Sequence, residues 1–414
     1  MAGLNVAAQV LIVSNGGAED LIGARLVGEL LRLRPGLRLR SLPLVGEGRA
    51  YAGVAPGVGP SLRLPSGGFP FATPANLSAD LRAGLIPGSL GQWAAARRAG
   101  RGTEQVVVVG DSYALLVGAL AAGAARPGRG GWPLTHLQPL VSALYREGMS
   151  TLDHLRELNA LGANLFMPWE VALGRRARQV YTRDAATARL LAARGVKAAY
   201  RGSFAMDLLP PSDGLPGAES DSAGDGRSML ALLPGSRGDA YESLPLMLEV
   251  ASRLPGMRAL VAWPLDWSAL PPLPGWGLEV QGDGAARLTR GGCEVGLRRG
   301  AFGAILRAAR LALATAGTAA EQAAGLGVPL VGFPTSGPQY TPGFARRQGR
   351  LLGAALTLCP PDAGALVGAL EQLDTRPDLY RMAAEAGRER IGAAGALPRI
   401  AAELLEGLEH GGPG

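Results

Sequence analysis

The feature that most constrains this chain is a run rich in proline, glycine, serine and aspartate at residues 210–226, which separates two stretches of alternating strand and helix patterns. Before the run, short apolar segments at residues 10–13, 37–44 and 106–109 read as strands, and helical spacing follows two of them. After the run, apolar segments recur at residues 229–233, 259–263, 311–314 and 329–333. Such alternation predicts parallel sheets covered by helices, and the run has the composition of an interdomain linker.

We therefore expect an α/β protein with two Rossmann-like domains, because 414 residues exceed one ordinary core. The expected boundaries are a first domain at residues 1–208, a linker at 209–227 and a second domain at 228–376. A helical tail at residues 377–414 is expected to pack back on the first domain, with a dimer contact as the alternative. Ligands of such sheets bind outside the carboxyl ends of the strands, so we expect the two sheets to face a central cleft.

The composition narrows the classes of partner. The chain carries a net charge of +7, but Lys197 is its only lysine, and no basic block is interleaved with aromatic residues. A nucleic-acid partner is therefore not expected, and an anionic substrate or membrane surface accounts for the charge as well. The two cysteines lie far apart, no signal peptide is evident, and no apolar run reaches the roughly 18 residues of a membrane span. We expect a cytoplasmic protein, with peripheral contact at the inner membrane face as an option.

Two loops of the second half have the chemistry of a phosphate site. Gly235, Ser236 and Arg237 follow the strand at 229–233; glycine admits a phosphate to the backbone, and arginine pairs with a diphosphate. An ordinary turn with a surface arginine is the alternative. Gly317 and Thr318 open a helix whose free N–H groups suit a phosphate, and capping by Thr318 is the alternative. A glutamate or glutamine in the same helix suits ribose hydroxyls, and the candidates are Glu321 and Gln322.

Two segments of the first half are candidates for the acceptor side. The loop after the first strand has no dinucleotide fingerprint, but it could form the floor of an acceptor site; its candidate residues are Asn15, Gly16, Gly17, Glu19 and Asp20. The acidic pair also suits a helix start, which is the alternative. Asp111 follows the strand at 106–109 and Gly110, where it could act as general base on an acceptor hydroxyl or cap the next helix.

The stretch at residues 62–93 mixes apolar residues with proline, glycine and nearby arginines. It reads either as an amphipathic segment that lies on lipid or as a loop folded onto the domain surface. The three histidines have no metal-ligand spacing, and no metal or cofactor is expected.

Taken in order, these segments resemble lipid-A-disaccharide synthase and a group of its bacterial relatives. The most specific matches are the Leu-Pro-Gly-Ser-Arg motif at residues 232–237 and the Gly-Thr-Ala loop that begins at Gly317. The resemblance covers nearly the whole chain. It implies a GT-B fold and an inverting, metal-independent transfer of a sugar from a UDP-sugar to a lipid-linked acceptor. It also implies that Arg237 and the Gly317–Thr318 loop bind the diphosphate, that residues 297–302 meet the uracil, and that Asp111 is the base.

The sequence departs from that family at three places. The stretch at residues 62–93, where the family would have its acyl-chain site, matches it poorly. Relatives often have a histidine in the first loop, where this chain has Gly17, and the ribose-binding position falls on Gln322, with Glu321 one place earlier. Two other functions therefore stay open: a UDP-sugar epimerase or hydrolase of similar architecture, and a non-catalytic nucleotide-sugar-binding protein.

Overall fold

The computed structural model describes residues 9–66, 74–125, 132–150, 152–153, 157, 165–210, 226–235, 238–337 and 339–409. The chain divides into two compact units: unit 1 comprises residues 1–208 and 394–414, and unit 2 comprises residues 209–393. The expected fold class, two α/β domains, is confirmed. The expected tail is divided between the units. α15 (Pro377–Ile391) belongs to unit 2, whereas α16 (Ala396–Glu409) belongs to unit 1 and packs on its first helix.

Unit 1 is built on a six-stranded sheet in the order β2-β1-β3-β4-β5-β6, with every pair parallel. Its strands are β1 (Gln9–Ser14), β2 (Arg38–Pro43), β3 (Gln105–Val109), β4 (Leu134–Gln138), β5 (Gln179–Thr182) and β6 (Ala198–Ala199). Within the described residues its helices, besides α16, are α1 (Gly17–Leu33), α2 (Pro74–Arg82), α3 (Leu85–Gly100), α4 (Ser112–Ala124), α7 (Pro168–Arg176), α8 (Ala185–Ala192) and α9 (Phe204–Asp207), with short 3-10 turns at Arg49–Tyr51 and Ala143–Arg146.

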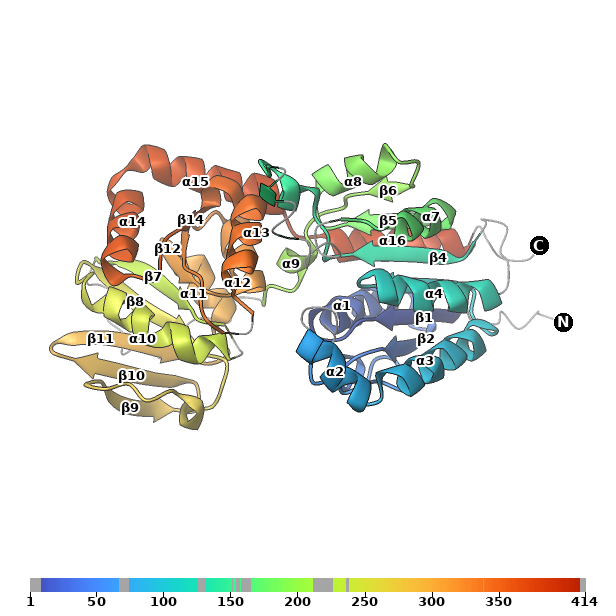
Figure 1. Cartoon of the computed structure of the whole chain (residues 1–414), viewed down its shortest axis with the longest axis horizontal. Coiled ribbons are helices and arrows are strands. Elements are labelled where there is room, and N and C mark those ends of the chain that lie inside the picture. The colour runs from blue at the N-terminus through green and yellow to red at the C-terminus, as the bar shows by residue number, and fades with distance from the viewer. Residues whose placement is uncertain are drawn as a thin grey trace. The chain divides into compact units, whose positions relative to one another are not determined.

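The side chains of each strand point alternately to the two faces of the sheet, and this explains the helical layers of unit 1. Val10 and Ile12 face a core that includes α1 and α16, whereas Leu11 and Val13 face the core formed with α3 and α4. Successive side chains of a strand point to opposite faces, so a strand that is apolar throughout needs a helical layer on both sides. The red α16 lies among the blue and green elements of unit 1 and supplies part of one such layer (Figure 1).

Unit 2 is built on an eight-stranded sheet in the order β14-β13-β12-β7-β8-β11-β10-β9. Its strands are β7 (Ser228–Leu233), β8 (Met257–Ala262), β9 (Gly277–Gly282), β10 (Ala285–Arg290), β11 (Cys293–Arg298), β12 (Leu311–Ala314), β13 (Leu330–Gly332) and β14 (Leu356–Leu358). Its helices, besides α15, are α10 (Asp239–Ser252), α11 (Phe302–Ala308), α12 (Gly317–Leu326), α13 (Pro342–Leu352) and α14 (Ala363–Thr375), with 3-10 turns at Trp267–Ala269 and Gly353–Ala355.

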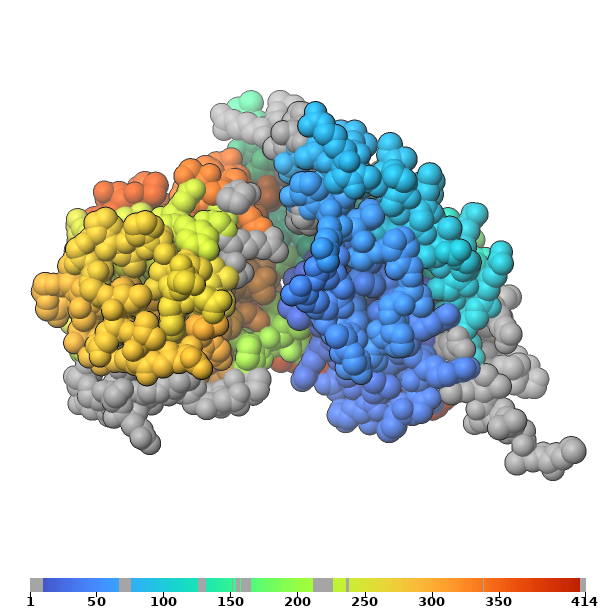
Figure 2. Space-filling view, turned by 90° about the horizontal axis from the view of Figure 1, so that it is seen from below, coloured from blue at the N-terminus to red at the C-terminus, as the bar shows by residue number. Residues whose placement is uncertain are grey.

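The second sheet, which we expected to be parallel, is mixed at one edge. β10 pairs antiparallel with both β9 and β11, so the sheet ends in a meander. β9 is exposed along its whole length, and Figure 2 shows these yellow strands at the surface of unit 2. Because β9 and β10 are joined by a tight turn rather than by a helix, they pair antiparallel.

Candidate functional site

The two glycine loops of unit 2 meet where the strand order reverses. β7 and β12 are neighbours, and the chain continues outward from them in opposite directions. Thr315, which follows β12, donates from its backbone N to Leu233 O at 3.1 Å and from its hydroxyl to Pro234 O at 3.3 Å. Gly235 has φ +89°, and a Cβ on it would lie 3.4 Å from the Ala316 Cβ. The loops that the sequence marks for phosphate are therefore side by side at a switch point, the usual place for a ligand in such sheets.

The second of these loops leaves a helix N-terminus open. α12 begins at Gly317, and its N-cap residue, Ala316, makes no side-chain cap hydrogen bond. The alternative that Thr318 caps this helix is wrong, because Thr318 already lies in the first turn, where its side chain is exposed. Glu321 is half-buried, whereas Gln322 is 4% exposed. Ser236 and Arg237, the other residues predicted here, lie outside the described residues.

Two residues that the sequence did not single out support loops at this end of the sheet: Gln348 supports the Gly317 loop, and Asp239 supports the loop that follows β13. Gln348, on α13 and 2% exposed, donates from Nε2 to Gly317 O at 2.7 Å. Asp239, the first residue of α10 and 4% exposed, accepts through Oδ1 from Thr335 Oγ1 at 2.7 Å and from Tyr340 N at 2.9 Å. Each ties a loop at the carboxyl end of the sheet to a helix. An acidic residue at a helix start is common, so the sequence held no signal for this role.

The two candidate segments of unit 1 also meet at a switch point, between β1 and β3. Asn15 donates from its backbone N to Val109 O at 3.3 Å, and its Oδ1 accepts from Asp111 N at 3.3 Å. Gly110 between them has φ +151°, and a Cβ there would lie 2.4 Å from Asn15 Oδ1. Only glycine allows this approach, and it brings the first loop onto the backbone of Asp111.

Asp111 has the helix-capping role that its sequence position suggests. It is the N-cap of α4, and its Oδ1 accepts from Tyr113 N at 2.9 Å and Ala114 N at 3.1 Å. Its Oδ2 makes no hydrogen bond within the described part of the chain, and the residue is half-buried. One oxygen therefore caps the helix while the other is open to a ligand.

The first loop presents only part of its predicted set to solvent. Gly17 is exposed and begins α1, and Glu19 is half-buried. Gly16 has φ +126°, and a Cβ on it would lie 2.4 Å from Val45 O, so this position also requires glycine. Asp20 is only 4% exposed and accepts a hydrogen bond from the Ser14 hydroxyl; burial raises its pKa. Its carboxyl supports the loop from beneath rather than facing a ligand.

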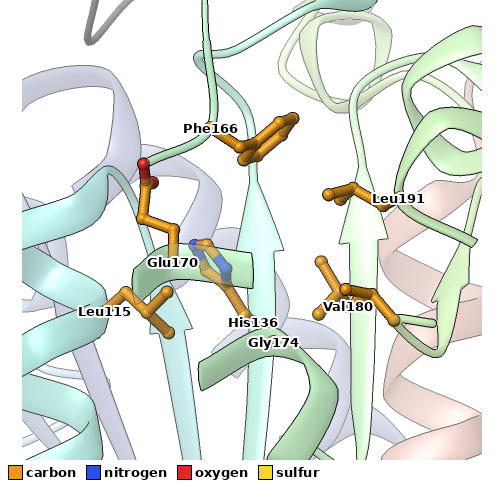
Figure 3. Close-up of a pocket in the computed structure, with 8 residues that line it drawn as sticks. Leu115, His136, Phe166, Glu170, Gly174, Val180 and Leu191 are labelled. Carbon is orange, nitrogen blue, oxygen red and sulfur yellow. The ribbon is translucent and has the colours of Figure 1, made fainter. Parts of the chain in front are cut away.

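Two further titratable groups of unit 1, His136 and Glu170, line a small cavity (Figure 3). His136, on β4, interacts through Nε2 with Gly110 O at 2.9 Å, and complete burial lowers its pKa to about 4. Glu170, on α7 and 5% exposed, accepts from Met167 N at 2.7 Å. Burial raises the pKa of Glu170 to about 7; the Met167 hydrogen bond opposes that change, and the negative charge of Asp111 adds to it. Glu170 carries no distinctive sequence signal, because a glutamate at the third helical position is an ordinary capping residue.

Within the described residues, no group of three or more histidine, cysteine, aspartate or glutamate side chains could hold a metal ion. A separate search of the same residues finds no helix that is both long and apolar enough to cross a bilayer.

Two α/β units, one built on a parallel sheet and one on a mixed sheet, define the class: the chain has the GT-B fold. Its structure is similar to that of CalG4, the calicheamicin glycosyltransferase, with 18% identity, a TM-score of 0.64, and coverage of 99% of this chain and 100% of CalG4. It is also similar to a UDP-GlcNAc 2-epimerase from Neisseria meningitidis bound to UDP-GlcNAc (12%, TM-score 0.56, coverage 96% and 100%) and to MurG from Acinetobacter baumannii (13%, TM-score 0.53, coverage 96% and 99%). No family model matches the sequence, and neither does any curated protein. At these identities the similarity establishes the fold alone.

Proposed function

We propose that this protein is an inverting glycosyltransferase, similar to lipid-A-disaccharide synthase, that transfers a sugar from a UDP-sugar to a lipid-linked acceptor. The observation that carries the proposal is the meeting of the Pro234–Gly235 and Thr315–Gly317 loops at the switch point of unit 2, beside the uncapped start of α12. Backbone N–H groups at such a helix start bind phosphate, and they can stabilise a leaving diphosphate without a metal.

In this proposal each candidate residue of unit 2 has one role. Gly235, Ser236 and Arg237 bind the diphosphate together with the N–H groups of Gly317 and Thr318. The ribose hydroxyls bind Glu321 or Gln322, and the half-buried Glu321 is the more accessible of the two. The uracil meets the backbone at residues 297–302, between the end of β11 and the start of α11.

The acceptor is assigned to unit 1, where Asp111 is the proposed base. Its open Oδ2 takes the proton of an acceptor hydroxyl. The hydroxyl oxygen of the acceptor then attacks the anomeric carbon of the sugar, and the bond from that carbon to UDP breaks. Asn15, Gly16, Gly17 and Glu19 would line the same acceptor side.

The lipid portion of the acceptor is assigned to the surface formed by α2 and α3, shown in lighter blue in Figure 2. α3 has no acidic residue and carries Arg97 and Arg98, and Ile86 and Leu90 on it are 60% and 56% exposed. Between α3 and α4 runs a groove of about 420 Å³, and its walls are formed by Leu90, Trp93, Ala94, Arg97, Leu116 and Leu120. An apolar groove with a cationic rim suits a hydrocarbon chain that carries an anionic head group, and it also suits peripheral contact with a membrane.

The donor assignment is tested by calorimetric titration with UDP, UDP-GlcNAc and, as a control, NAD. Wild type should bind both uridine ligands, and Arg237→Ala should lose at least about tenfold in affinity, because a charge-assisted diphosphate contact is removed. Arg381→Ala is the matched control, since Arg381 lies on the exposed side of α15 and its hydrogen bond is to Pro377 O. If wild type binds neither uridine ligand, the donor assignment is wrong.

The reaction type is tested by product analysis after UDP-sugar binding is established. Transfer predicts UDP release that depends on a lipid-linked acceptor and yields a new glycosidic bond. An epimerase would convert UDP-GlcNAc without any acceptor, and a hydrolase would release free sugar. Either of the last two outcomes would replace the transferase proposal.

A further inference from the structure

The two sheets of the described chain have four edges, and three of these edges are closed to further strands. β6 and β14 have only two and three residues. β2 is covered by its own chain: Ser41 N donates to Pro56 O at 2.9 Å, and Val58 N donates to Ser41 O at 2.8 Å. Short edge strands and covered edges are common ways in which a sheet avoids pairing with another chain.

The fourth edge, β9, is open. The strand has six residues, all of them exposed, and β10 is its only partner within the described residues. Figure 1 shows β9 as the outermost strand of the unit 2 sheet. The strand contains no proline or lysine, the residues that often keep an edge unpaired. Trp267 Nε1 donates to Gly282 O at 3.2 Å, and this contact occupies only the last residue of the strand.

This open edge has an apolar face. Leu278 and Val280 are 46% and 53% exposed. In the β9–β10 ladder they lie opposite Leu288 and Ala286, which are buried in the core of unit 2. Trp276, the half-buried residue before the strand, packs against the same core. Because paired residues of two strands lie on the same face, the buried face of the sheet continues at β9 into solvent.

We propose that β9 pairs antiparallel with β9 of a second copy of this chain, about a two-fold axis at Leu278. The β9–β10 ladder skips Gln281, so this bulge ends the regular part of the edge, Gly277–Val280. Directly opposed residues share a face, so the axis passes through a residue and not between two residues. Two registers pair three regular residues, one centred on Leu278 and one on Glu279. The second opposes two glutamates, which is destabilising, and charge therefore favours the first.

The polar face of the strand is complementary to itself in this register. Glu279 of one copy lies opposite Gly277 of the second copy, which has no side chain to obstruct the carboxylate. The hydroxyl of Thr289 lies 3.2 Å from the place where a Cβ on Gly277 would be, so it can donate to that carboxylate. Within the described residues the side chains of Glu279 and Thr289 have no other hydrogen-bond partner.

The apolar face is complementary as well. Leu278 contacts its own copy across the axis, and Val280 lies opposite Trp276 of the second copy. Each copy uses its one open edge in this pair, and the other edges of the described chain are closed, so the assembly stops at a dimer. The paired segment is short, and we therefore expect a weak dimer.

The dimer does not depend on the proposed sugar transfer, and it is tested on the full chain without ligand. Sedimentation equilibrium between about 1 and 200 µM, a range suited to small interfaces, should show a monomer that associates to a dimer. Leu278→Lys places two like charges on the axis and should raise the dissociation constant about tenfold. Leu33→Lys is the matched control, because Leu33 is 42% exposed and lies in unit 1, and it should dimerise like wild type.

The register is tested by cross-linking. Directly opposed residues of an antiparallel pair have Cα atoms about 4.5–5.5 Å apart, which is within reach of a disulfide. Leu278→Cys should therefore form a covalent dimer under mild oxidation, whereas Leu33→Cys and wild type should not. A wild type that stays monomeric at the highest concentration overturns the proposal. So does a dimer that Leu278→Lys leaves as strong as in wild type, or one that Leu278→Cys fails to cross-link.

Discussion

Asp111 caps a helix and is also the proposed base, and two substitutions separate these roles. Asp111→Asn keeps an oxygen that can accept from Tyr113 N and Ala114 N, so the stability of unit 1 should change by less than about 0.5 kcal/mol. Asp111→Ala removes both hydrogen bonds and should cost about 1 kcal/mol, which lowers Tm by about 2–4 °C for a unit of this size.

Both substitutions remove the base, so both should lower kcat by about 10²–10⁴ while UDP binding is unchanged. The assays are thermal unfolding, UDP calorimetry and acceptor-dependent UDP release. Asp362→Ala is the control for capping alone, because Asp362 caps α14 through Ala365 N, and it should lower stability without lowering kcat. If Asp111→Asn transfers sugar at the wild-type rate, Asp111 is only a cap and the base lies elsewhere.

Three further predictions follow from the same geometry. Gly110→Ala should destabilise unit 1 by about 1–3 kcal/mol in urea unfolding, because its Cβ would lie 2.4 Å from Asn15 Oδ1 at a φ of +151°; an unchanged midpoint would show that the loop yields freely. Lowering the pH from 7 to 5 should reduce the free energy of unfolding of wild type by about 2 kcal/mol more than that of His136→Gln. The reason is that histidine is protonated near pH 6.5 in the unfolded state and only near pH 4 in the folded state. Equal losses of stability would contradict the burial of a neutral imidazole. This comparison cancels the contribution of Glu170, which has the opposite sign because its pKa is raised in the folded state. Gln348→Ala should weaken UDP binding by freeing the carbonyl of Gly317, whereas Gln372→Ala on α14 should not; equal affinities in calorimetry would remove Gln348 from the site.

Strands that are apolar throughout were predictable from sequence, because burial on both faces leaves no polar position. The expected segment at residues 311–314 coincides with β12, and that at 106–109 lies within β3. β4 was not predicted, because Thr135, His136 and Gln138 interrupt its apolar pattern. These polar side chains are nevertheless buried. β9 was missed because every residue of it is exposed, so no apolar run marks it.

The loops of the candidate site were predictable one by one from the sequence. The contacts that hold these loops in place were not. Gly235 and Gly317 carry local signals, and parallel strands place such loops at one sheet edge. The supporting contacts of Asp239 and Gln348 join residues about a hundred and about thirty positions apart, and no local pattern encodes them. The stretch at residues 62–93, expected as a lipid-facing segment or a surface loop, contains α2 and the first half of α3. The apolar residues of these two helices were recognisable in the sequence. Their helical spacing was not, because prolines and glycines interrupt it.

The division of the chain into units has a consequence for its biosynthesis. α16 buries Leu397, Ile400 and Leu404 against the core of unit 1, yet it is the last helix of the described chain. A ribosome therefore delivers all of unit 2 before unit 1 can complete its helical layer. Domains generally fold in the order of synthesis, but here unit 2 has every element it needs first. Until α16 emerges, the nascent first 208 residues expose an apolar strip that chaperones would bind.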